Sequence, residues 1–229
     1  MVDLGLCGEA PVEAKPWLLW VWVYMQAPRP DGLSSSTEAP KLYEIEDAIE
    51  LHLGREERAV FCGRITTEGR RELYFYGEKT EGFEKAVGMA MTDFAEYKFS
   101  LGVKDDPGWS QYLNVLYPGP EDLERIKNGD LLDVLTRKGD ILSIPRQVMH
   151  WIYFRSSESR SLFSKAAVDA GFVVESEHEV DRDRRFSICV YRVQSIEQNK
   201  IDEIAIQLLH LAQGVDGDYD GWETPVITQ

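Results

Sequence analysis

Hydrophobic positions along the chain recur with two periods, every second residue as in a strand and every third or fourth residue as in a helix. In the segment "LLWVWVYM" (18–25), aliphatic residues alternate with Trp20, Trp22 and Tyr24, which is typical of a strand with two different faces. The first half of the chain has six predicted elements in the order βαββαβ, at residues 16–25, 40–53, 58–66, 70–77, 81–94 and 97–103. This order predicts a ferredoxin-like sheet with two helices on one face.

The same order begins again in the second half, after a Pro-Gly-Pro boundary at 118–120 and a helix expected at 121–138. Its elements are predicted at residues 148–154, 157–170, 172–180, 184–193, 196–213 and 215–223. An Asp/Arg-rich turn is expected at 181–184. We therefore expect an α+β protein of two ferredoxin-like (βαββαβ) α/β-sandwich domains in tandem, with antiparallel sheets. The domains are expected at residues 1–118 and 119–229.

Side chains at the predicted helix ends suggest where these helices start and stop. Thr80 is suited to one N-cap position and Ser156 or Ser157 to another, where a hydroxyl accepts a hydrogen bond from a free N–H group. Ser195 and Gln198 have the spacing of a capping box. Gly171 can adopt the left-handed backbone that ends a helix.

Aromatic residues gather on the sheet face that the helices of the first domain leave open. Trp20, Trp22 and Tyr24 are expected to share that face with Tyr74 and Tyr76, because the first and third strands are central neighbours in this fold. An exposed aromatic surface of this size needs a cover or a ligand.

The second domain repeats the pattern with Trp151 and Tyr153, which are expected to share a face with Cys189 and Tyr191. RNA-recognition domains stack bases on such strands, but the glycine–aromatic signature of their third strand is missing here. Three explanations stay open for the aromatic faces. The sheets pack on each other or on the 121–138 helix, or the faces bind a protein partner, or they form a small-molecule pocket.

Arg29 and Asp31 lie in the loop "PRPDG", which follows the first strand and leads away from the aromatic face. They are candidates for polar contacts in a pocket on that face. Their simpler explanation is turn chemistry, because proline fixes φ and the Asp-Gly pair reverses the chain.

Composition narrows the class of partner. The chain has 229 residues, 43% of them hydrophobic, so it can bury a core in each domain. Its formal net charge is −15, and the acidic residues are spread over both halves. Because phosphate contacts dominate the affinity for nucleic acids, we expect no direct nucleic-acid partner. The charge suits attraction to a basic protein.

Three cysteines far apart, Cys7, Cys62 and Cys189, indicate reduced thiols and a cytoplasmic protein. The most apolar segment (16–25) is about half the length that a membrane span needs, and the start of the chain lacks the pattern of a signal peptide. We expect no membrane association. The oligomeric state stays open.

The segment "DGDYDGWE" near the C-terminus imitates the opening of a calcium loop. Asp216, Asp218 and Asp220 stand at ligand positions one, three and five, and Gly221 at position six. Position twelve, which should be a bidentate glutamate, is Ile227, so a ligand that is essential for calcium affinity is missing. We expect no metal site there.

Other chemistry-bearing residues form no recognisable set. The four histidines lie on different predicted elements and lack the spacing of metal ligands, at His52, His150, His178 and His210. The sequence contains no nucleophile elbow, phosphate-binding loop or dinucleotide fingerprint. We therefore expect no catalytic residues, no metal and no cofactor.

The C-terminal half, from about 120 to 224, resembles the regulator of ribonuclease E activity B family, also called ribonuclease E inhibitor B. The resemblance is carried by "RQVMHWIYFRS", "GFVVESEHE", "FSICVYRV" and "GDYDGWET". It implies a protein that binds the scaffold part of ribonuclease E and alters RNA turnover without performing a reaction itself.

The N-terminal half resembles the domain of unknown function family 695, through "VDLGL", "PWLLWVWVYM", "PRPDGLSS", "LYEIEDAIE" and "GRITTEGRRELYFY". Members of that family have further residues before the counterpart of "VDLGL", so we expect a first element to be missing or trimmed here. The resemblance implies no activity.

The leading hypothesis is a non-catalytic, acidic binding protein that regulates a ribonuclease E-type enzyme through protein contact. Its candidate binding patch combines two aromatic residues with three carboxylates, at Tyr219, Trp222, Asp218, Asp220 and Glu223. The alternative is a small-molecule binder or enzyme that uses the aromatic face of the first domain. A structural module of an assembly is a third hypothesis.

Overall fold

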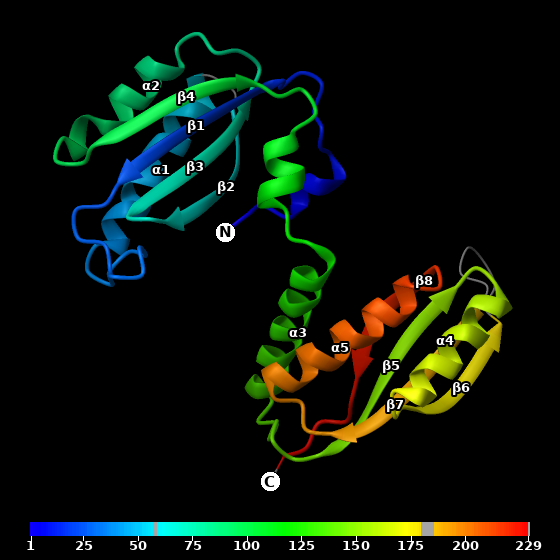
Figure 1. Cartoon of the computed structure of the whole chain (residues 1–229). Coiled ribbons are helices and arrows are strands. Elements are labelled where there is room, and N and C mark those ends of the chain that lie inside the picture. Colours follow the sequence, from blue (N-terminus) through cyan, green and yellow to red (C-terminus); the bar gives the residue numbers. More distant parts are fainter. Residues whose placement is uncertain (57–58, 180–185, 229) are drawn as a thin grey trace. The chain divides into compact units, whose positions relative to one another are not determined.

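The computed structural model describes residues 1–56, 59–179 and 186–228. They divide into two compact units, Met1–Tyr117 (unit 1) and Pro118–Gln229 (unit 2). Each unit has its own four-stranded sheet, and each is coloured by its position along the chain in Figure 1.

Unit 1 contains the first βαββαβ series. Its strands and α-helices are β1 (Trp17–Tyr24), α1 (Ala39–Glu56), β2 (Val60–Thr67), β3 (Arg70–Gly77), α2 (Phe83–Ala90) and β4 (Phe99–Asp105). Three short helical segments accompany them, η1 (Gly5–Gly8), η2 (Met91–Phe94) and the π-helix η3 (Tyr112–Leu116). The strands are antiparallel in the order β2-β3-β1-β4, with β1 and β3 at the centre.

The helices α1 and α2 pack on one face of this sheet, and the core lies between the two layers (Figure 1). The strict alternation of β1 decides which residues face it, so Leu19, Val21 and Val23 are buried against the helices. The helices contribute residues such as Leu42 and Val87 at helical spacing.

Unit 2 repeats the series after one additional helix. Its elements are α3 (Pro120–Arg137), β5 (Arg146–Phe154), α4 (Ser157–Asp169), β6 (Val173–Glu179), β7 (Phe186–Gln194), α5 (Gln198–Gln213) and β8 (Gly217–Glu223). The antiparallel order β6-β7-β5-β8 corresponds strand for strand to that of unit 1. The expected fold, two ferredoxin-like α+β domains in tandem, is confirmed.

In unit 2, α4 and α5 cover one face of the sheet, where Ile152, Ile188 and Val190 are buried (Figure 1). The additional helix α3 packs against α5. Leu132 and Leu135 of α3 join Ile201 in a second apolar cluster.

Local details differ from the sequence-based expectations at several helix and strand ends. The N-cap of α2 is Gly82, with a φ of 86°, and not Thr80. The predicted capping box of α5 is absent, because the N-cap is Glu197 and the Ser195 hydroxyl donates a hydrogen bond to the Glu197 carboxylate. Strand β4 begins at Phe99, two residues later than expected.

Two other expected ends are confirmed. The Ser156 hydroxyl accepts a hydrogen bond from the Ser159 N–H group at 3.1 Å and caps α4. Gly171 adopts a φ of 87° just after that helix, in the left-handed region that favours glycine. The turn expected at 181–184 lies outside the described residues.

Candidate functional site

The aromatic face of unit 1 is assembled as the alternation predicts. Trp20 lies opposite Tyr74 in the ladder of β1 and β3, and Leu18 lies opposite Tyr76. Trp22 and Tyr24 continue the same row toward the end of β1. This face is the one that α1 and α2 do not cover.

Residues 109–117 of the same unit cover one end of this face. The Trp109 ring stacks on the Tyr76 ring, with the ring centroids 4.2 Å apart and the planes 8° from parallel. Tyr112 and Leu116 of η3 join the same hydrophobic cluster, and Val2 at the start of the chain packs against it. Tyr76 and Trp109 are both 0% exposed. Within unit 1, the cover therefore comes from residues 109–117 and the N-terminal residues.

Polar contacts hold this cover in place. The buried Asp106 carboxylate accepts hydrogen bonds from the Tyr76 and Ser110 hydroxyls and from the Gln111 N–H group. Burial raises the pKa of Asp106, but these hydrogen bonds outweigh it and lower the pKa to about 2. The Trp109 indole N–H donates to the Lys15 carbonyl at 2.9 Å. These bonds tie the covering segment to the sheet and to the chain before β1.

The other end of the face is partly exposed. The centroids of the Trp20 and Trp22 rings are 4.6 Å apart, and Tyr24 is 38% exposed. The Arg70 guanidinium lies 4.7 Å from the centroid of the Trp22 ring and is bonded to Glu72 at 2.6 Å. At this end, the Trp22 ring and the Glu72 carboxylate together hold the Arg70 guanidinium.

The loop residues Arg29 and Asp31 bond to each other at 2.6 Å. The Asp31 carboxylate also accepts a hydrogen bond from the Leu33 N–H group at 3.1 Å. These contacts stabilise the loop itself, as turn chemistry predicts.

In unit 2, the two aromatic residues of the C-terminal candidate patch are buried. Tyr219 is 4% exposed and Trp222 is 8% exposed, while Asp218, Asp220 and Glu223 are exposed. A partner that approaches β8 meets these carboxylates and not the two rings.

A bulge in β8 explains this burial. Residues three apart in a regular strand point to opposite faces. In β8 the register shifts so that Tyr219 pairs with Ile152 while Gly221 pairs with Trp151, which leaves Asp220 as the extra residue. Gly221 takes a φ of 116° at this point. Both aromatic residues therefore face the helices, an outcome that simple alternation does not predict.

Trp222 and Tyr219 are held by polar partners that the sequence did not reveal. The Trp222 indole N–H donates to the Asn128 side-chain oxygen of α3 at 2.7 Å. The Tyr219 hydroxyl lies 2.8 Å from Nδ1 of His150 on β5. Burial lowers the pKa of His150 to about 3, with a smaller contribution from Arg192, and burial raises the pKa of Tyr219. Both side chains are therefore neutral at physiological pH and serve as packing partners.

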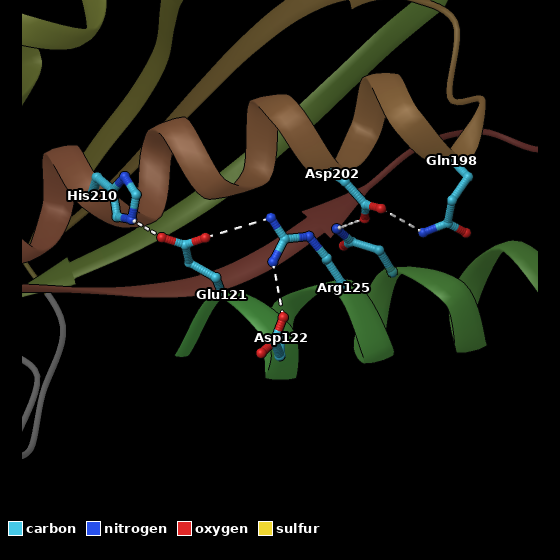
Figure 2. Close-up of polar contacts among 7 residues, drawn as sticks. Glu121, Asp122, Arg125, Gln198, Asp202 and His210 are labelled. Carbon is cyan, nitrogen blue, oxygen red and sulfur yellow. Dashed lines mark hydrogen bonds and ion pairs between the residues drawn. The ribbon is translucent and has the colours of Figure 1, made fainter. Parts of the chain in front are cut away.

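Polar contacts also join α3 to α5 (Figure 2). Asn128 donates to Asp202 at 2.8 Å, and Gln198 donates to the other oxygen of the same carboxylate at 2.8 Å. Near the start of α3, Glu121 lies 2.9 Å from the His210 ring nitrogen, and Arg125 pairs with both Glu121 and Asp122 (Figure 2). These contacts, called the α3–α5 seam, hold α3 in place, and with it the Asn128 side chain that accepts the hydrogen bond from Trp222.

The opposite face of the unit 2 sheet carries the second aromatic row. Trp151 lies opposite Cys189, Met149 opposite Tyr191, and Tyr153 opposite Ser187. The hydrophobic clusters formed by the described residues include none of Met149, Trp151, Tyr153 and Tyr191, which are all partly exposed. The Trp151 indole N–H donates to the Glu223 carboxylate at 3.2 Å. The structure brings these residues to one face, as expected, and within unit 2 no described element covers that face.

The thiols on these sheets are not poised for nucleophilic chemistry. Burial raises the pKa of Cys62 to about 12. Burial and the nearby Glu223 and Glu175 carboxylates raise the pKa of Cys189 to about 11. Within the described ranges, no three His, Cys, Asp or Glu side chains are grouped as metal ligands would be. No helix in the described part of the chain has both the length and the hydropathy of a membrane span.

Two family models match the chain, one in each half. Residues 1–117 match the model described as a family of unknown function, DUF695. The chain belongs to this family. Residues 125–224 match the model described as Regulator of ribonuclease activity B. Both resemblances seen in the sequence are thereby confirmed.

Similar solved structures add little to this assignment. An unknown protein from Galdieria sulphuraria is 8% identical with a TM-score of 0.25, covering 93% of this chain and 99% of that one. A putative glycine cleavage system transcriptional repressor is 8% identical with a TM-score of 0.28, covering 91% of this chain and 98% of that one. At these TM-scores neither likeness supports an argument. A comparison with curated proteins finds no match.

Proposed function

We propose that this chain is a non-catalytic regulator of a ribonuclease E-type enzyme, acting in the cytoplasm through protein–protein contact. The observation that carries the proposal is the match of residues 125–224 to the regulator of ribonuclease activity B family. That family regulates ribonuclease activity and is not a family of enzymes.

The chemistry of the chain supports binding over catalysis. A net charge of −15 attracts a basic partner and raises the rate of encounter at low salt. The buried His150, Cys62 and Cys189 have pKa values shifted toward their neutral forms, so they lack the reactive states that catalysis uses. The odd number and wide spacing of the three cysteines favour reduced thiols and a reducing compartment.

The alternative, a small-molecule pocket on the aromatic face of unit 1, requires access to Tyr74 and Tyr76. Tyr74 is 7% exposed and Tyr76 is 0% exposed beneath Trp109. The packing of these two rings favours the regulator over a pocket that includes them.

The test is capture of purified ribonuclease E by the immobilised full chain at several salt concentrations, together with an RNA cleavage assay. We expect capture that weakens as salt rises, and a changed cleavage rate when the chain is added. An unrelated protein of equal net charge is the control for attraction by charge alone. Absence of capture at low salt, or an equal effect of the control protein, would contradict the proposal.

A further inference from the structure

The uncovered face of the unit 2 sheet has the composition of a guanidinium-binding surface. It displays Met149 and Trp151 of β5 beside Tyr191 of β7, with Glu223 of β8 bonded to the Trp151 indole. We propose that this face binds an extended, arginine-rich segment of a partner protein, with an arginine side chain seated on Trp151 and bonded to Glu223. The identification of the partner as a ribonuclease rests on the proposed function, whereas the preference of this surface for arginine does not.

The face presents large side chains above small ones. Cys189 and Ser187 of β7 are buried, with 1% and 3% of their surface exposed, whereas their partners across the ladder, Trp151 and Tyr153, are partly exposed. The small residues thus lie beneath the larger side chains around them. The aromatic rings form the surface that a partner meets.

A carboxylate borders this aromatic row on the β8 side. Glu223 on β8 is within hydrogen-bond distance of Trp151. Glu175, an exposed residue at the register shift of β6, adds negative charge near Cys189 and helps to raise the pKa of that thiol. Aromatic rings next to carboxylates attract a cation that can also stack, and this selects arginine over lysine, because a guanidinium is planar and donates in a fixed fork.

Unit 1 shows the same recognition within the chain. There the Arg70 guanidinium lies over the Trp22 ring, with 4.7 Å to the centroid, and is bonded to the Glu72 carboxylate. Trp151 with Glu223 repeats the aromatic–carboxylate half of that arrangement on the other sheet. The Arg160 and Arg192 guanidiniums of unit 2 lie over Phe186 and Phe172, and in the proposal the ligand supplies the arginine for Trp151.

The strand geometry also sets the expected shape of the ligand. Met149, Trp151 and Tyr153 alternate along β5, so neighbouring side chains on this face are separated by about 7 Å. An extended peptide has the same repeat between every second residue. Arginines at alternate positions therefore match the spacing of the row.

The experiment measures binding of short synthetic peptides to the full chain by calorimetry. One peptide has arginine at alternate positions, a second has lysine at those positions, and a single-stranded RNA of similar length is the third probe. We expect the arginine peptide to bind about 3- to 10-fold more tightly than the lysine peptide, because stacking adds to the charge attraction. Equal binding of both peptides, or preferential binding of the RNA, would overturn the proposal.

Variants locate the site. Trp151→Ala should weaken binding of the arginine peptide about 10-fold, Trp151→Phe less, and Glu223→Gln about 3-fold. Tyr24→Ala, an exposed aromatic residue on the sheet of unit 1, is the matched control and should leave the affinity unchanged. Circular dichroism checks that each variant is folded. A folded Trp151→Ala chain that binds the peptide as the wild type does would contradict the assignment.

The same variants separate this inference from the proposed function. If the wild-type chain captures ribonuclease E and the folded Trp151→Ala chain captures it equally well, the surface is wrong while the function stands. If the wild-type chain binds the arginine peptide through Trp151 but captures no ribonuclease E, the function is wrong while the surface stands.

Discussion

The two units share one order of strands and helices but differ in what happens on the sheet face opposite the helices. In unit 1 this face is partly closed by Trp109, Tyr112 and Leu116. In unit 2 the corresponding face retains Trp151 and Tyr191 in partly exposed positions.

The difference follows from where each unit places its additional segment. Residues 106–117 follow β4 and fold back over the sheet, where Trp109 stacks on Tyr76. The additional helix of unit 2, α3, precedes β5 and packs on α5 instead. The same fold therefore has a sheet face partly closed by its own unit in unit 1, and a sheet face that no described element of its own unit covers in unit 2.

Removing the cover of unit 1 should produce the largest effect. Trp109→Ala leaves a cavity above Tyr76 and should lower the free energy of unfolding of unit 1 by about 3–5 kcal/mol. Trp151→Ala, on the uncovered face of unit 2, should cost less than about 1 kcal/mol in its own unit. Peptide-resolved hydrogen exchange in denaturant measures the units separately. Equal costs for the two tryptophans would remove the distinction between the faces.

The units should also respond to acid at different pH values. The His150 pKa is lowered from 6.5 to about 3, so below pH 6.5 the unfolded chain takes up a proton that folded unit 2 does not. Its free energy of unfolding should fall by about 1.4 kcal/mol per pH unit between pH 6.5 and 3. His150→Gln should remove this slope.

In unit 1 the comparable group is Asp106, whose pKa is lowered from 3.8 to about 2. Its stabilising contribution is present above pH 3.8 and is lost as the pH falls from there to about 2. Hydrogen exchange over a pH series should therefore show unit 2 losing protection first. Loss of protection in unit 1 first, in the wild-type chain, would argue against both assignments.

A smaller effect is expected at the link between α3 and the sheet of unit 2. Asn128→Ala removes the acceptor of the Trp222 indole and the donor to Asp202, and should destabilise unit 2 by about 1–3 kcal/mol. Asp130→Ala, at an exposed position of the same helix, is the control. Denaturant unfolding followed by tryptophan fluorescence checks both. Equal midpoints for the two variants would show that the buried bonds contribute little.

The smallest effect is expected at the exposed end of the α3–α5 seam. Glu121→Gln weakens its contacts with His210 and Arg125, which are all solvent-exposed, and should change the free energy of unfolding by less than about 1 kcal/mol. The same unfolding experiment at two salt concentrations measures it. A loss as large as that of Asn128→Ala would mean that this end anchors α3.

Much of the fold could be predicted from hydrophobic periodicity. The alternation in "LLWVWVYM" predicted both faces of β1, and the repeated βαββαβ order predicted both sheets. These features depend on neighbouring residues, which a sequence shows directly.

The parts that could not be predicted depend on irregular backbone and on long-range contacts. No regular period reveals that Trp109 and the short π-helix η3 pack on the sheet of unit 1. Because of the bulge at Asp220, Tyr219 and Trp222 both face the core. Of the predicted surface patch, only the carboxylates are therefore exposed. Asn128 reaches Trp222 from 94 residues away in the chain.

We propose that the sheet face of unit 2 opposite α4 and α5 is the surface with which this chain binds a ribonuclease E-type enzyme. Hydroxyl-radical footprinting of the full chain, alone and mixed with ribonuclease E, tests it most directly. We predict that Trp109 is protected in both samples, while Trp151 is oxidised in the free chain and protected in the mixture. Equal oxidation of Trp151 in the two samples, with the complex formed, would contradict the claim.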